Sequence, residues 1–222
     1  MVENTNIRKA VVLGGTGLIG GELIKLLVKN SSYSEIRILG RRDVDIASSK
    51  IRFYKVDMEN LQQHESLFEV DVVFCCLGTT IKTAGTKEAF RKVDYDMVVN
   101  AAKIAEKYIK NFILISSLGA NANASNFYLK TKGEVEKMVL ESNIESISIL
   151  RPSILYGNRV EKRSGEKIGI AFMKFATPIL QGSLKKYRGI EATTVAEAMV
   201  IYDLEEKKGK FIYESPEIEL KV

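Results

Sequence analysis

Short apolar runs rich in β-branched residues alternate along the chain with longer segments whose apolar residues recur at helical spacing. The predicted strands are residues 10–13, 36–39, 51–56, 71–77, 112–115 and 147–150, and the predicted helices between them are residues 18–28, 86–108 and 125–140. Alternation at this spacing is typical of a parallel sheet with right-handed crossovers and helices on both faces. We therefore predict an α/β fold with a doubly wound parallel sheet in three layers (α/β/α), binding ligands at the carboxyl ends of its strands.

The length of the chain favours a single domain. Its 222 residues suffice for one sizeable core, and the 45% hydrophobic and 27% charged residues exclude a disordered chain or a disulfide scaffold. After Arg151-Pro152 the alternation stops, although residues 168–175 and 193–203 have helical patterns. This tail, residues 152–222, is too short for a second full domain, so we expect it to form a lid and a pocket wall.

Charge and targeting features argue against several classes of function. The net charge is +5, but Lys and Arg are interspersed with Glu and Asp, so nucleic acid is not the expected partner. The polar N-terminus does not resemble a signal peptide, and no apolar stretch is long enough to span a membrane. We expect a cytoplasmic protein with a small-molecule substrate, as a monomer or a homodimer.

The cysteine and histidine content of the chain argues against a metal site. The two cysteines, Cys75 and Cys76, are adjacent, so on a strand they point to opposite faces. The chain has one histidine and no paired ligand spacing of the kind that zinc sites use. We predict reduced thiols and no bound metal.

A glycine-rich turn follows the first predicted strand and opens the first predicted helix. It reads Gly14-Gly15-Thr16-Gly17-Leu18-Ile19-Gly20. Glycine allows a sharp turn and close approach of a pyrophosphate, while the helix N-terminus supplies free N–H donors. A generic tight turn is the alternative, but the position between strand and helix favours a Rossmann-like dinucleotide site.

The residues after the second and third strands bear on the choice of cofactor. Proteins specific for NAD commonly place a carboxylate after the second strand to hold the ribose 2′-hydroxyl, whereas this chain has Arg41 and Arg42. Guanidinium groups pair well with a 2′-phosphate, so we predict NADP(H) over NAD(H), with a solvated loop charge as the alternative. Asp57, after the third strand, is placed to accept from the adenine amino group or to cap a turn.

Tyr128 and Lys132 form a second motif on the predicted helix 125–140. Four residues apart, they share one helix face. A phenol has an ordinary pKa near 10, and a nearby ammonium lowers it toward the range useful for proton transfer. The preceding strand ends in Ser116-Ser117, whose hydroxyls are expected at the same edge. Such spacing also arises by chance on helices, but this position favours catalysis.

Taken together, these motifs resemble the short-chain dehydrogenase/reductase superfamily, and within it the atypical NAD(P)-binding branch that includes the Tat-interacting protein oxidoreductases. The matching segments cover most of residues 8–200: residues 14–20, 74–80, 116–120 and 128–136, and Arg151-Pro152. The run Cys-Cys-Leu-Gly-Thr-Thr at residues 75–80 is the most specific of them.

The resemblance implies a Tyr–Lys–Ser catalytic set that works with NADPH. Tyr128 is then the acid/base, Lys132 holds the nicotinamide ribose and lowers the pKa of the phenol, and Ser116 or Ser117 orients the substrate oxygen. Many extended relatives have a third serine where this chain has Leu118, which leaves open which hydroxyl serves. The predicted cofactor-binding residues are Gly14, Thr16, Gly17, Leu18, Ile19, Gly20, Arg41, Arg42, Asp57, Met58, Cys76, Leu77, Gly78, Thr79, Tyr128, Lys132 and Pro152.

Two functions fit this reading. The first is an NADPH-dependent reductase of a carbonyl or similar small-molecule group. The segments around Tyr156, Phe172 and Tyr187 are the candidates for substrate contacts, with a place in the core as the alternative for their aromatic residues. The second is a dinucleotide-binding sensor or regulatory protein with little or no turnover, which the fold alone does not exclude.

Overall fold

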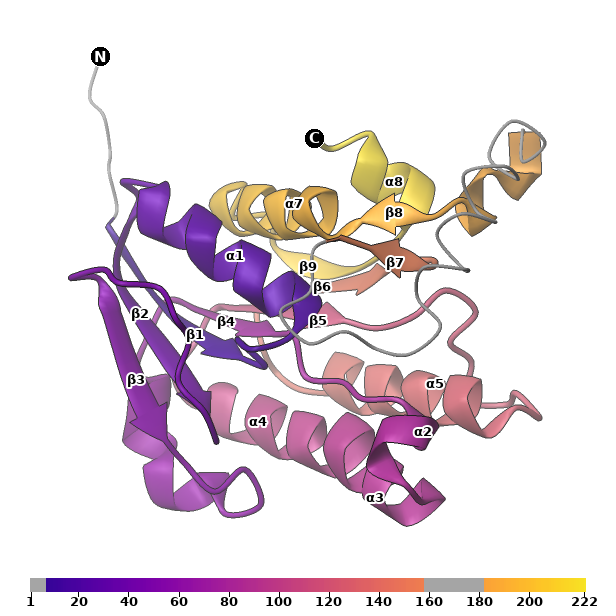
Figure 1. Ribbon diagram of the computed structural model, residues 1–222, viewed down its shortest axis with the longest axis horizontal. Coiled ribbons are helices and arrows are strands. Elements are labelled where there is room, and N and C mark those ends of the chain that lie inside the picture. The colour runs from indigo at the N-terminus through magenta and orange to yellow at the C-terminus, as the bar shows by residue number, and fades with distance from the viewer. Residues whose placement is uncertain (1–6, 158–181) are drawn as a thin grey trace.

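A parallel sheet of seven strands forms the centre of the computed structural model, which describes residues 7–157 and 182–222 (Figure 1). The strand order is β3-β2-β1-β4-β5-β6-β9, and every neighbouring pair is parallel. The strands are β1 (Arg8–Leu13), β2 (Tyr33–Gly40), β3 (Ile51–Lys55), β4 (Val72–Cys75), β5 (Asn111–Ile115), β6 (Ser146–Arg151) and β9 (Gly209–Glu214).

Helices cover both faces of this sheet (Figure 1). One face carries α1 (Leu18–Lys29), α7 (Ala192–Leu204) and α8 (Ser215–Glu219). The opposite face carries α2 (Ile81–Ala84), α3 (Lys87–Arg91), α4 (Met97–Ala105), α5 (Phe127–Leu140) and the 3₁₀ helix η1 (Leu61–Phe68). The predicted three-layer, doubly wound α/β fold is thus confirmed.

The central strands are continuously apolar because both of their faces are covered. All four residues of β4 are buried, and so are all five of β5. Val72 and Phe74 pack into the core under α1 and α7, whereas Val73 and Cys75 pack into the core under α4. Because both faces are buried, these strands lack the alternation of apolar and polar residues that is typical of strands with one face in solvent.

The helix predicted over residues 86–108 contains a π-helical turn. Between α3 and α4 the chain forms the turn η2 (Lys92–Asp96), which inserts an extra residue into the helical repeat. As a result Asp94 is fully buried, although it lies in a stretch whose spacing otherwise follows an ordinary amphipathic helix. Such π turns occur frequently at functional sites.

The tail contributes to the core as well as to the pocket region. The predicted helix 193–203 is confirmed as α7, but β9, which extends the sheet beside β6, was not predicted. Strands β7 (Leu155–Tyr156) and β8 (Ile190–Glu191) form a small separate sheet. The 3₁₀ helix η3 (Gly182–Tyr187) comes just before β8 in the sequence. The helix predicted over residues 168–175 lies outside the described residues.

A buried polar cluster joins the amino ends of the strands to the end of α7. The carboxylate of Asp203, which is fully buried, accepts hydrogen bonds from Arg8 at 2.8 Å, the Tyr33 hydroxyl at 2.6 Å and Asn111 at 2.8 Å. Arg8 also pairs with Glu206, whose side chain is 60% exposed. This cluster lies at the edge of the sheet opposite to the carboxyl ends of the strands.

We predict that Asp203→Asn lowers the free energy of unfolding by about 3 kcal/mol or more, because it leaves the buried guanidinium of Arg8 without its buried counter-charge. Urea denaturation measures this change. Glu206→Gln removes the exposed partner of the same arginine and should cost at most about 1 kcal/mol. Equal losses for the two variants would contradict the assignment of Asp203 as the structural hub.

Candidate functional site

A cleft of about 530 Å³ lies at the carboxyl edge of the sheet. It is lined by the glycine turn and the start of α1, by residues following β2 and β4, and by side chains of η2 and α5. Parallel α/β sheets bind ligands at this edge, and most of the predicted site residues meet here.

The glycine turn is packed too tightly for side chains at two of its positions. Gly14 has a φ of +78°, and a Cβ there would lie 2.5 Å from the carbonyl oxygen of Cys76. A Cβ on Gly20 would lie 2.3 Å from the carbonyl oxygen of Gly14. The turn is closed by the Gly17 N–H, which donates to the Gly14 oxygen at 2.9 Å. Glycine is therefore required where β1, β4 and α1 meet.

The start of α1 fits an anionic group. The helix begins at Leu18, its N-cap residue Gly17 has no side chain to occupy the free N–H groups, and its first turn carries no acidic residue. Thr16 and Gly17 are exposed, and both line the cleft together with Leu18 and Ile19. Unpaired backbone donors at a helix N-terminus form a ready site for a phosphate, so this part of the chain fits the pyrophosphate of a dinucleotide.

The loop after β2 brings charges of both signs to the cleft. Arg42 is exposed and lines it, whereas Arg41 is exposed but lies outside the lining among the described residues. Asp43 and Asp45 line the same end. The Asp43 carboxylate accepts the backbone N–H of Val44 at 2.7 Å. Of the two arginines predicted to bind the cofactor, the structure therefore places only Arg42 in the cleft.

Asp57 caps a turn after β3. Its carboxylate accepts the Glu59 N–H at 3.0 Å and the side-chain amide of Asn60 at 2.6 Å, and these bonds lower its pKa. Met58 is buried in the hydrophobic core. Within the described part of the chain neither residue lines the cleft, so the structure does not bring together the predicted adenine contacts.

The segment after β4 runs along the cleft. Cys76, Leu77, Gly78 and Thr79 all line it. The Cys76 N–H donates to the carbonyl oxygen of Leu13 at 2.9 Å, which holds this segment beside the end of β1. Both cysteines are free thiols, and burial raises the pKa of Cys75 to about 12.

Tyr128 and Lys132 are placed in the cleft by α5. The helix begins at Phe127, and the side chain of its N-cap residue Asn126 accepts the Leu129 N–H at 3.1 Å, the usual role of asparagine at this position. Tyr128 is half-buried, and its ring packs against Phe90 with 5.5 Å between centroids. Lys132, one turn further along, is almost fully buried.

Asp94 of the π turn pairs with Lys132. Its Oδ1 lies 2.7 Å from the Lys132 Nζ, and its Oδ2 accepts the Thr79 N–H at 2.8 Å. Burial is the largest single influence on Lys132 and on its own would lower its pKa, but the attraction and hydrogen bond of Asp94, together with smaller contributions from Tyr128 and Cys75, outweigh burial, so the pKa is raised. Asp94 was not among the predicted site residues, because the π turn that points it inward leaves no signal in the spacing of apolar residues.

The Ser116 hydroxyl is held by a carboxylate that the sequence analysis also missed. Ser116 lines the cleft, but its hydroxyl donates to Glu136 Oε1. Arg151 Nε donates to the same carboxylate oxygen at 2.9 Å, and this bond raises the pKa of the arginine. Ser117 is half-buried, with its Oγ 3.5 Å from the carbonyl oxygen of Leu118.

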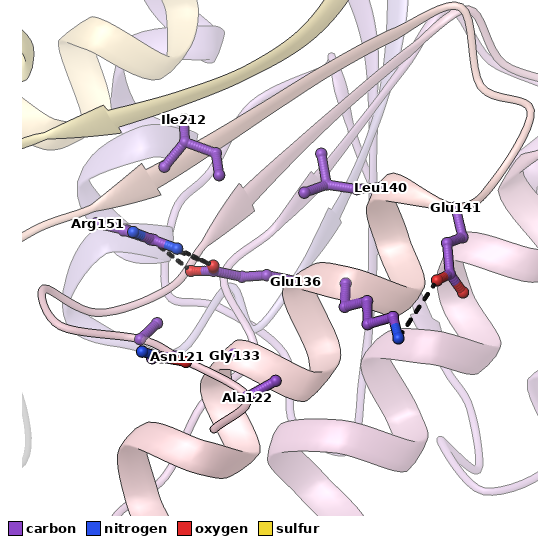
Figure 2. Close-up of a pocket in the computed structure, with 10 residues that line it drawn as sticks. Asn121, Ala122, Gly133, Glu136, Leu140, Glu141, Arg151 and Ile212 are labelled. Carbon is purple, nitrogen blue, oxygen red and sulfur yellow. Dashed lines mark hydrogen bonds and ion pairs between the residues drawn. The ribbon is translucent and has the colours of Figure 1, made fainter. Parts of the chain in front are cut away.

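The Glu136–Arg151 pair also lines a second hollow, a groove of about 510 Å³ beside α5 (Figure 2). Figure 2 shows the guanidinium of Arg151 facing the carboxylate of Glu136 between the strands and the loop at Asn121. Glu136 lines this groove and accepts from Ser116, which lines the cleft. The pair therefore lies between the two hollows.

The remaining predicted residues lie outside the lining of the cleft in the described part of the chain. Pro152 is buried, and its carbonyl oxygen accepts the Leu118 N–H at 3.0 Å. Of the aromatic residues proposed for the substrate pocket, Tyr156 is half-buried in β7 and Tyr187 is exposed, whereas Phe172 lies outside the described residues. Leu155 lines the cleft.

Comparisons with known proteins agree with this geometry. A family model described as NAD(P)H-binding matches residues 14–200. Protein HTATIP2 of Rattus norvegicus is 36% identical over 170 residues, which cover 74% of this chain and 70% of that protein. Protein FMP52, mitochondrial, of Candida albicans is 32% identical over 197 residues, or 85% of each chain.

Solved structures share the fold. WbmG of Bordetella bronchiseptica, solved in complex with NAD, matches with a TM-score of 0.72 at 14% identity, covering 96% of this chain and 74% of that one. ADP-L-glycero-D-manno-heptose-6-epimerase of Helicobacter pylori matches with a TM-score of 0.71 at 18% identity, covering 96% and 79%. At these identities the likeness concerns the fold alone.

The comparisons correct the predicted location. Several fungal relatives bear the name FMP52, mitochondrial, so the expectation of a cytoplasmic protein, which relied on the polar N-terminus, is wrong. Among the helices of residues 7–157 and 182–222, none combines the length and the hydropathy needed to cross a membrane.

We predict that Gly17→Ala weakens dinucleotide binding about tenfold or more, which corresponds to about 1.4 kcal/mol, while the melting temperature changes little. Gly17 has a φ of −77°, and its added Cβ would meet only the Gly14 oxygen, at 3.1 Å, so the turn itself tolerates alanine. Isothermal titration with NADPH measures the affinity.

Gly20→Ala is the matched comparison, because its Cβ would collide with the backbone of the turn. It should lower the melting temperature as well as the affinity. Unchanged NADPH affinity in a folded Gly17→Ala protein would show that the cofactor does not bind at this turn.

Proposed function

The chain belongs to the NAD(P)H-binding family as an atypical short-chain dehydrogenase/reductase, and from that premise we propose that it reduces a carbonyl or similar group of a small molecule with NADP(H). The observation that carries the proposal is the meeting of Tyr128 and Lys132 with the glycine turn in one cleft. A phenol and an ammonium on one helix face can serve a single bound group.

The reaction divides between the cofactor and the chain. When bound, the nicotinamide supplies a hydride from C4 to the carbonyl carbon. The Tyr128 hydroxyl hydrogen-bonds the carbonyl oxygen and donates its proton as negative charge develops there. The product is an alcohol, and Tyr128 is left as a phenolate that regains a proton from solvent.

Lys132 and a serine hydroxyl assist Tyr128 in this proposal. The ammonium of Lys132 holds the nicotinamide ribose and lies one helical turn from the phenol. The hydroxyl proton of Ser116 is already donated to Glu136. Among the described residues the Ser117 hydroxyl makes one long contact, 3.5 Å to a backbone oxygen, although Ser117 itself lies outside the lining of the cleft. Ser117 is therefore the better candidate to orient the substrate oxygen.

The preference for NADP(H) depends in this proposal on Arg42. Its side chain is exposed at the end of the cleft where the residues following β2 meet the glycine turn. A guanidinium can donate two parallel hydrogen bonds to one phosphate group. Asp43 and Asp45 at the same end oppose a second negative charge. In this proposal Arg42 faces the ribose 2′-phosphate and outweighs that repulsion.

We predict that Tyr128→Phe lowers the rate of NADPH oxidation by about a hundredfold or more, because positioned proton transfer contributes about 10²–10⁴-fold to catalysis. The assay follows NADPH fluorescence with a panel of aldehydes and ketones under single-turnover conditions. NADPH affinity should be preserved, since the ring of phenylalanine keeps the contact with Phe90.

Tyr108→Phe serves as the control. It removes the same hydroxyl from a half-buried residue between α4 and the amino end of β5, which lies outside the lining of the cleft in the described part of the chain, so its rate should equal that of the wild type. Tight NADPH binding without oxidation by any carbonyl compound would contradict the reductase and favour a sensor.

We predict that Arg42→Ala weakens NADPH binding about 10–100-fold while NADH affinity changes little, because a hydrogen bond to a charged group contributes about 1.5–3 kcal/mol. Asp43→Asn, the neighbouring charge change, should instead improve NADPH binding by reducing repulsion. An equal loss of affinity for both cofactors in Arg42→Ala would argue against NADP(H) preference.

A further inference from the structure

The charge of Lys132 is balanced before any ligand enters the cleft. Lys132 Nζ lies 2.7 Å from Asp94 Oδ1, and the two side chains are 6% and 0% exposed. A carboxylate and an ammonium at this distance and depth interact strongly, because water screens them little. The pair therefore contributes almost no net charge to the surroundings of Tyr128.

Other ionisable groups near Lys132 do not alter this balance. Among the described residues, those that act on its ammonium are Asp94 from η2, Tyr128 from α5 itself and Cys75 from β4. Burial raises the pKa of Cys75 to about 12, so this thiol stays neutral. The next carboxylates along α5, Glu134 and Glu136, are paired with Arg91 and Arg151.

Resting on the proposed function, we propose that Asp94 is a positioning residue that acts on Tyr128 through Lys132, balancing the ammonium so that the phenol keeps its proton and favours the reductive direction. An unbalanced ammonium one helical turn away would stabilise the phenolate. Reduction requires the phenol as the acid, whereas oxidation of an alcohol requires the phenolate as the base.

Asp94 also couples this charge to the cofactor side of the cleft. Its second oxygen accepts the Thr79 N–H at 2.8 Å, and Thr79 belongs to the segment that lines the cleft after β4. A Cβ on the adjacent Gly78 would lie 3.5 Å from Asp94 Oδ1 and 3.7 Å from Lys132 Nζ. The same carboxylate thus fixes the ammonium and the backbone that a bound nicotinamide would touch.

The test is a pH titration of Tyr128 itself, which requires no substrate. Tyrosine labelled with carbon-13 at Cζ reports phenol ionisation by NMR, and the Tyr128 signal is the one missing from Tyr128→Phe. We expect Asp94→Asn to lower the pH midpoint of Tyr128 by about one pH unit, both in the free protein and with saturating NADP⁺. Asp96→Asn makes the same change at an exposed site two residues away and should leave the midpoint unmoved.

Two further variants complete a charge cycle. Lys132→Gln leaves the Asp94 carboxylate unbalanced and should raise the midpoint, whereas Asp94→Asn combined with Lys132→Gln removes both charges and should return it close to the wild-type value. If Asp94→Asn alone does not fold, the comparison of Lys132→Gln with the double variant still isolates the effect of Asp94.

An unchanged or raised midpoint in folded Asp94→Asn would overturn the inference, and so would equal midpoints for Lys132→Gln and the double variant. A purely structural role for Asp94 would weaken NADP⁺ and NADPH binding without moving the Tyr128 midpoint, which also overturns it. Failure of the proposed function is separate, because it shows as an absence of turnover in the wild type whatever the titration gives.

Discussion

Helices cover both faces of the sheet, so polar side chains of the central strands can reach solvent or a ligand only at the ends of the strands. In β4 and β5 every residue is buried, and polar chemistry begins immediately beyond them at Ser116 and at the segment Cys76–Thr80. Because the strands are parallel, all of these ends meet at one edge. The opposite edge gathers the amino ends and carries the cluster around Asp203. The parallel arrangement thus separates a structural polar cluster from a functional one.

Buried charges at both edges are balanced by partners from other elements. Asp203 pairs with Arg8 at one edge, while Asp94 with Lys132 and Glu136 with Arg151 pair near the other. Removing two charges from water costs free energy that the pairing must offset, so such pairs are weak evidence for added stability. Their effect is to fix geometry and local charge. At the cleft the N-terminus of α1 keeps backbone N–H groups for an anionic ligand.

Local features of this site could be predicted from the sequence, and features that depend on distant packing could not. The glycine turn, the Asn126 cap and the spacing of Tyr128 and Lys132 each lie within a few residues, so local rules specify them. Asp94 is 38 residues from Lys132 in the sequence, and its burial depends on a π turn.

The same dependence on distant packing explains why only some of the cofactor contacts predicted after β2 and β3 lie in the cleft. Arg41 and Arg42 are adjacent and alike in type, so only the course of the loop decides that Arg42 reaches the cleft. Asp57 satisfied the expected position after a strand, but its carboxylate caps the following turn.

Helix α5 shows why spacing alone does not define this chemistry. Tyr128, Lys132 and Glu136 follow one another at intervals of four residues, yet each meets a different element: α3 through Phe90, η2 through Asp94, and the end of β5 through Ser116. Their positions relative to the serine hydroxyls depend on how closely α5 approaches the loop after β5. A Cβ on Gly133 would lie 2.1 Å from the backbone nitrogen of Ala122. Glycine at this position therefore lets the helix press against the loop, and it sets the distance between the phenol and the hydroxyls that are proposed to share one substrate.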